Sequence, residues 1–82
     1  MATTYKIAFV EWQNNDDFAI VYDKRTFRRM MSAIRYVELH RKRFLRKEKE
    51  YLNDLIAIDI YVECWNGESC EGAIYSICLW EK

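Results

Sequence analysis

The chain has 82 residues, the size of one domain near the lower limit of what folds without disulfides or metals. Hydrophobic residues make up 51% of it and aromatic residues 16%, which suffices for a core because a large aromatic side chain buries about 150–250 Å². With no proline and only two glycines, the composition excludes flexible linkers and low-complexity segments. We therefore expect a single domain over residues 1–82.

Residues 1–6 lack the charged and apolar regions of a signal peptide, and no apolar run approaches the ~20 residues that a membrane span needs. We expect no membrane partner and a cytoplasmic location, in the host cytoplasm if the chain is viral. The three cysteines, Cys64, Cys70 and Cys78, match no zinc-binding spacing, and His40 is the only histidine. The sequence predicts reduced thiols, no metal and no cofactor.

Two strands joined by a tight turn are predicted at the start of the chain. Residues 5–12 and 18–22 are rich in aromatic and β-branched residues, and the polar cluster 13–16 between them is typical of a turn. A turn centred on Asn14-Asn15 would place Phe9 opposite Ile20. One face of this hairpin would then carry an apolar set: Tyr5, Ile7, Phe9, Phe18, Ile20 and Tyr22.

A long helix is predicted next, with Asp23 or Thr26 as its N-cap and helical spacing from Phe27 to about Asn53. The predicted apolar stripe is Phe27, Met30, Met31, Ile34, Val37, Phe44, Leu45 and Leu52. A helix of about 28 residues would be about 42 Å long, whereas strands of about 8 residues span about 27 Å. We therefore expect the helix to extend beyond the sheet or to break near His40-Arg41.

A second hairpin is predicted in the last third, with strands at 56–65 and 73–80 and a turn at Asn66-Gly67. The predicted core face is Ile56, Ile58, Ile60, Val62, Ala73, Tyr75, Ile77 and Leu79, with Trp80 on the opposite face. Gly72 is a candidate β-bulge that would shift the register. In this register no two cysteines lie close enough to form a disulfide.

The predicted fold class is α+β, with ββαββ order. The expected architecture is a four-stranded antiparallel sheet with one long helix, continuous or broken, packed across one face. Each hairpin alone would be marginal, so the helix is expected to join both into one core.

Charge is distributed very unevenly along the chain. Residues 24–50 hold eleven basic and three acidic side chains, a net charge of +8, and the remainder carries −8. A basic helix of this kind can bind phosphates or an acidic protein surface. The predicted partner-binding residues are Arg28, Arg35, Tyr36, Arg41, Lys42, Arg43, Arg46, Lys47 and Lys49. Four aromatic residues are further anchor candidates: Trp12, Tyr36, Trp65 and Trp80.

No catalytic constellation stands out, since there is no Gly-rich phosphate loop and no cysteine with a partner for redox chemistry. The first hypothesis is a small non-catalytic inhibitor or modulator of a nucleic-acid-associated protein complex, anti-CRISPR-like in size and style. Such compact domains are common among phage and mobile-element inhibitors of host defence. The alternative is direct binding of RNA or DNA through the same helix. A third hypothesis is self-association of the basic helix with the acidic sheet of another copy.

Overall fold

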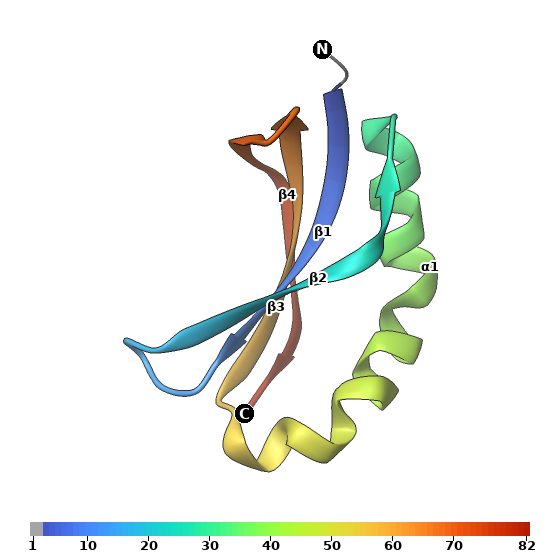
Figure 1. Ribbon diagram of the computed structural model, residues 1–82. Coiled ribbons are helices and arrows are strands. Elements are labelled where there is room, and N and C mark those ends of the chain that lie inside the picture. Colours follow the sequence, from blue (N-terminus) through green and yellow to red (C-terminus); the bar gives the residue numbers. More distant parts are fainter. Residues whose placement is uncertain (1–2) are drawn as a thin grey trace.

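The computed structural model describes residues 3–82, except for the side chains of residues 48–51. Four strands form one antiparallel sheet: β1 (Thr3–Trp12), β2 (Phe18–Phe27), β3 (Ala57–Asn66) and β4 (Ser69–Glu81). Between the two hairpins lie the helix α1 (Met30–Glu48) and the 3₁₀ segment η1 (Lys49–Asp54). The strand order is β2-β1-β3-β4, so β1 and β3 are central and β2 and β4 are the edges (Figure 1). The predicted ββαββ fold is confirmed.

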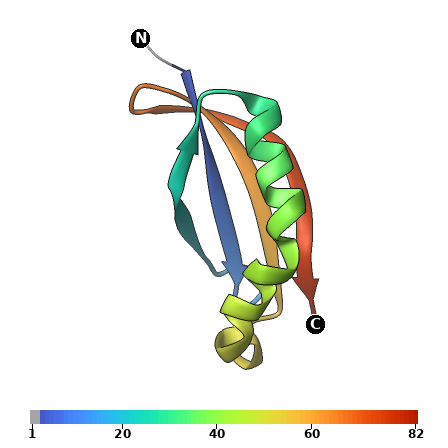
Figure 2. The ribbon, with the colours of Figure 1, turned by 90° about the vertical axis from the view of Figure 1, so that its right-hand side faces the viewer.

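The helix covers one face of the sheet (Figure 2) and leaves the other face open (Figure 1). Alternate residues of β1 and β3 point toward the helix, because side chains alternate between the two faces of a strand. From the helix, Ala33, Val37 and Phe44 reach the sheet, and the Phe9 and Phe44 rings meet edge to face at 5.0 Å. The core consists of Ile7, Phe9, Ala33, Val37, Phe44, Leu55, Ile58, Ile60, Val62 and Leu79.

The register of the first hairpin differs by one residue from the prediction. Phe9 lies opposite Val21, and Ile20 lies opposite Val10. This shift moves Phe18, Ile20 and Tyr22 to the open face, because neighbouring residues of a strand point to opposite faces. The predicted apolar face, which placed these three residues with Phe9, is therefore wrong.

The second strand is longer than predicted, and the helix begins later. β2 continues to Phe27, and its pairing with β1 is irregular in the middle: residues 23–25 of β2 lie opposite the single residue Ile7 of β1. Asp23 and Thr26 therefore lie in a strand, and the prediction that either caps the helix is wrong. The Asp23 carboxylate instead accepts a 2.8 Å bond from the Arg25 backbone amide, which stabilises the shifted segment.

The helix has 19 residues and runs without a break through His40-Arg41. Its length of about 29 Å is close to that of the 10-residue strands, about 33 Å, so α1 itself does not overhang the sheet, and only η1 extends beyond the strand ends (Figure 2). Met30 and Met31, placed in the apolar stripe by the sequence, are 41% and 59% exposed. The basic side chains Arg46 and Lys47 lie in the last helical turn, where the helix dipole favours positive charge.

The second hairpin turns at Gly67 and Glu68, one residue later than predicted. Gly67 has a φ of 65°, a conformation that glycine adopts without steric cost. The register between β3 and β4 shifts at three places, and Gly72, with a φ of 122°, lies within the shifted segment. The expected bulge is thus present.

These shifts change which face some residues of β4 occupy. Trp80 lies opposite Ile58 and packs against the core, whereas the sequence placed it on the open face. Ala73 lies opposite Glu63 and is exposed, so its predicted core position is also wrong. The three cysteines are free, as predicted.

Candidate partner-binding surface

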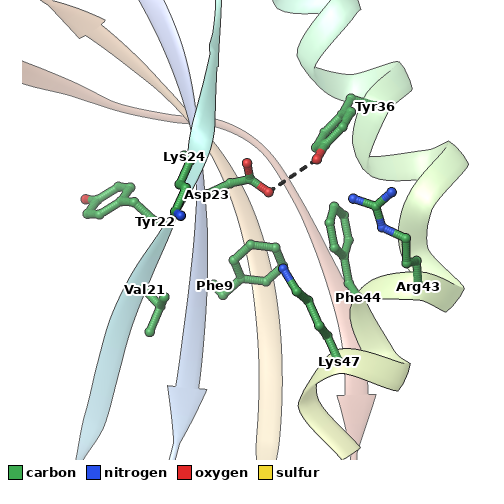
Figure 3. Close-up of a pocket in the computed structure, with 9 residues that line it drawn as sticks. All are labelled: Phe9, Val21, Tyr22, Asp23, Lys24, Tyr36, Arg43, Phe44 and Lys47. Atoms are coloured by element: carbon green, nitrogen blue, oxygen red, sulfur yellow. Dashed lines mark hydrogen bonds between the residues drawn. The ribbon is translucent and has the colours of Figure 1, made fainter.

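A small pocket lies between β2 and the side of α1 that faces it, the β2 flank of the helix. Its volume is about 300 Å³, and its apolar walls include Phe9, Val21 and Phe44. Arg43 and Lys47, one helical turn apart, extend from α1 toward β2 (Figure 3). The remaining lining residues are Tyr22, Asp23, Lys24 and Tyr36. Three cations around one carboxylate make this pocket positive.

The sequence predicted that Tyr36 points outward from the helix. In the structure it lies half-buried at the wall of this pocket. Its ring packs between those of Phe27, at 5.2 Å, and His40, at 4.7 Å, with both pairs tilted. Its hydroxyl donates a 3.4 Å hydrogen bond to Asp23 (Figure 3). Burial, and then the Asp23 carboxylate, raises the pKa of Tyr36, while the nearby Arg43 opposes this shift. Tyr36 thus connects the helix to β2 as part of the core.

A groove runs along the opposite side of α1, the β4 flank. Its first part, of about 410 Å³, is lined by Glu38, Leu39, Arg41, Lys42, Leu45 and Leu79. Its second part, of about 390 Å³, is lined by Lys42, Leu45, Arg46, Leu52 and Trp80. Because Lys42 and Leu45 line both parts, the two hollows adjoin, and together they are called the groove. Three cations therefore border an apolar surface.

Among the described residues, the most exposed large apolar side chain is Leu39, at 74%, and it stands at the rim of this groove. Beside it, the Tyr75 hydroxyl of β4 donates a 3.3 Å bond to Glu38 of α1. Burial, and then Glu38, raises the pKa of Tyr75. This hydrogen bond holds the rim to the sheet edge.

The predicted site residues are therefore divided between the two flanks of α1. Arg43, Lys47 and Tyr36 line the pocket on the β2 flank. Arg41, Lys42 and Arg46 line the groove on the β4 flank. Arg28 lies in the bend before α1 and Arg35 is exposed on it, and both are outside these hollows. The prediction for Lys49 falls on a side chain outside the described residues.

The open face of the sheet is aromatic, and its aromatic side chains are tied to two carboxylates. The Trp12 indole donates to Asp59 at 3.1 Å. Glu63 accepts a bond from the Tyr22 hydroxyl at 2.9 Å and another from the Trp65 indole at 3.1 Å. Trp12, Tyr36, Trp65 and Trp80 are all half-buried. The anchors proposed from the sequence are thus held within the molecule.

The sequence analysis missed the residues that give each flank its character. Leu39 and Leu79 complete the groove, and Asp23 is the only carboxylate among the described residues that line the pocket. Leu39 could have been identified from the sequence as a candidate contact, since it carried the signal of an apolar residue within the predicted basic arc of the helix. Asp23 carried none, because it was read as a helix cap.

Within the described residues, no three His, Cys, Asp or Glu side chains gather as metal ligands. The same part of the chain has no helix with the length and apolar character of a membrane span. Comparison with protein-family models, curated proteins and solved structures yields no match to this chain.

Proposed function

We propose that this chain is a non-catalytic binding domain that docks helix α1 on an acidic surface of another protein. The observation that carries the proposal is the groove on the β4 flank. There Arg41, Lys42 and Arg46 border an apolar surface on which Leu39 is 74% exposed. An apolar centre with a charged rim is the usual composition of a protein interface.

The apolar part of this groove favours a protein partner over nucleic acid. Binding to a phosphate backbone requires cations and gains little from an exposed leucine. A protein partner can instead cover Leu39, and burial of a leucine side chain contributes about 1.5–3 kcal/mol. The expected partner segment therefore combines acidic side chains with one or two apolar residues.

The partner predicted from the sequence is a complex that handles nucleic acid, and the predicted role is to modulate or inhibit it. Affinity capture from cells that produce the chain, followed by mass spectrometry, tests this prediction. Capture is repeated with Leu39→Ala and with Lys42→Glu/Arg46→Glu. Both variants are expected to lose the partner, because one removes the apolar contact and the other reverses the charge of the rim.

Arg28→Glu/Arg29→Glu is the matched control. It changes the net charge by the same amount but alters residues that lie outside the groove. If the control loses the partner as completely as Lys42→Glu/Arg46→Glu, net charge alone drives binding and the groove is not the site. Retention of the partner by Leu39→Ala would refute the role of the apolar contact.

Direct binding of RNA or DNA is the second candidate, and the pocket on the β2 flank favours it. Lys24, Arg43 and Lys47 could contact phosphate oxygens there, beside the aromatic side chains of Tyr36 and Phe44. Fluorescence anisotropy with labelled single-stranded and duplex oligonucleotides at low salt tests this candidate. Binding should weaken steeply with salt and with Arg43→Glu/Lys47→Glu, and should be unaffected by Leu39→Ala. No binding at low salt would eliminate it.

A further inference from the structure

The first half of β2 leaves apolar side chains exposed on both faces of the sheet. Phe18, Ile20, Val21 and Tyr22 are 51%, 45%, 48% and 42% exposed. They belong to an uncharged segment, Phe18–Tyr22, on a strand that pairs only with β1. In Figure 2, β2 runs along the left side of the sheet, and only the tip of the β3–β4 hairpin, above it, reaches farther to the left. Such an edge presents free backbone donors and acceptors to another strand.

The other edge of the sheet, β4, is interrupted more often than β2, whose one register shift against β1 follows Tyr22. β4 shifts its register against β3 at three places, and bulges of this kind disrupt pairing with a further strand. In contrast, residues 18–22 pair with β1 in continuous register from Trp12 to Ala8. An uncharged and apolar edge is a surface that folded proteins normally cover.

Opposite charges lie at the two ends of this exposed segment. Asp16 and Asp17 precede it, and Lys24 and Arg25 follow it shortly after. All four side chains are exposed. If an identical strand pairs antiparallel, the acidic end of each copy lies beside the basic end of the other. The segment is therefore complementary to itself in charge as well as in apolar character.

We propose that β2 pairs antiparallel with β2 of a second copy about a two-fold axis at Val21, which joins two four-stranded sheets into one. Val21 then lies opposite Val21 of the second copy, and Ile20 lies opposite Tyr22 of that copy. The acidic end of each segment, at Asp17, then lies near the basic end of the other copy's segment, at Lys24 and Arg25. A two-fold axis gives a closed dimer, so the pairing ends at two chains.

The interface expected from this geometry is small. Phe18 and Tyr22 are about half exposed, so each can bury on the order of 100 Å² in the dimer. With Ile20, Val21 and the strand backbone added from both copies, the total approaches about 1,000 Å², the lower limit for a specific interface. The dimer is therefore expected to form over a micromolar range of concentration.

Sedimentation equilibrium of the full chain over a concentration series tests the proposal. The apparent mass should rise from the monomer value of 10.0 kDa toward twice that value. Val21→Lys should weaken association roughly tenfold or more, because it places two like charges opposite each other at the axis. Leu39→Lys is the matched control: it adds the same charge at an exposed apolar residue of α1 and should leave association unchanged. Circular dichroism checks that both variants keep the fold.

Charge reversal tests the antiparallel arrangement. Asp16→Lys/Asp17→Lys should weaken the dimer several-fold at low salt, and adding Lys24→Asp/Arg25→Asp to the same chain should restore it. Hydrogen exchange should also slow with rising concentration at alternate amides of residues 18–22. A chain that stays monomeric into the high micromolar range would overturn the proposal. So would a dimer that Val21→Lys leaves intact, or one that dissociates at high salt and depends on the basic helix.

Discussion

Val37 lies between α1 and the sheet, and none of its side chain is exposed. Val37→Ala removes two methyl groups, each contributing about 0.8 kcal/mol by burial, and it leaves a cavity that adds to the loss. The expected decrease in the free energy of unfolding is about 2–3 kcal/mol. A domain of this length has a total stability of roughly 4–12 kcal/mol, so the change should lower the Tm by roughly 10–20 °C.

Urea denaturation followed by circular dichroism measures this loss, with Leu39→Ala as the control on the same helix. Leu39→Ala removes more carbon atoms than Val37→Ala. Because the Leu39 side chain is 74% exposed, the substitution should lower the free energy of unfolding by no more than about 0.5 kcal/mol. Equal losses for the two variants would show that the helix packs through a different face. A loss below about 0.5 kcal/mol for Val37→Ala would have the same meaning.

Burial, and then Glu63, raises the pKa of Tyr22 to about 12. The folded state holds the Tyr22 proton more tightly than the unfolded state, so the contribution of Tyr22 to stability should be lost as the pH rises from about 10 to 12. Glu63→Gln should lower the pKa of Tyr22 in a tyrosinate absorbance titration. Burial, followed by the Asp59 and Glu81 carboxylates, raises the pKa of the Cys78 thiol. Iodoacetamide should therefore alkylate Cys78 more slowly than Cys70, and equal rates in peptide mass mapping would contradict this. Gly72→Ala should cost about 1–3 kcal/mol in urea denaturation, although no atom lies within 4 Å of the added Cβ, because the φ of 122° is strained for any other residue.

The fold class could be predicted because its signals are local. The polar cluster 13–16 and Asn66-Gly67 each lie between apolar runs of strand length, and both mark hairpins in the structure. The alternating β3 residues Ile58, Ile60 and Val62 all face the helix, as predicted. Local patterns of this kind need no knowledge of distant contacts.

The register of β2 could not be predicted, because residues 18–22 are apolar at every position. A strand without alternation fits either register equally well, and only the length of the loop decides between them. The side-chain oxygens of Asp23 and Thr26 then suggested a helix N-cap, although both residues lie in β2, in or beside its irregular part. With Phe27 outside the helix, the inferred apolar stripe was misplaced, and Tyr36 was therefore placed on the wrong side.

The candidate site was predicted in part. The sequence identified the basic residues of α1, but it treated them as one surface facing away from the core. The structure separates them into two flanks because α1 lies flat on the sheet and its cations border the sheet on both sides. The bulges of β4 bring Trp80 beneath the groove. The sequence analysis assumed strict alternation of faces along β4, which places Trp80 on the opposite face.

The pairing of β1 with β3 has a consequence for how this chain folds. Thr3 lies opposite Asn66 and Trp12 lies opposite Ala57, so the centre of the sheet joins residues that are 45 or more positions apart in the sequence. Each hairpin can form from local contacts, whereas the β1–β3 pairing requires closure of a long loop and is expected to limit the folding rate. During synthesis the first hairpin and the helix are complete before β3 emerges, and their apolar faces remain uncovered until then. A chain cut after η1 is therefore expected to aggregate rather than to fold.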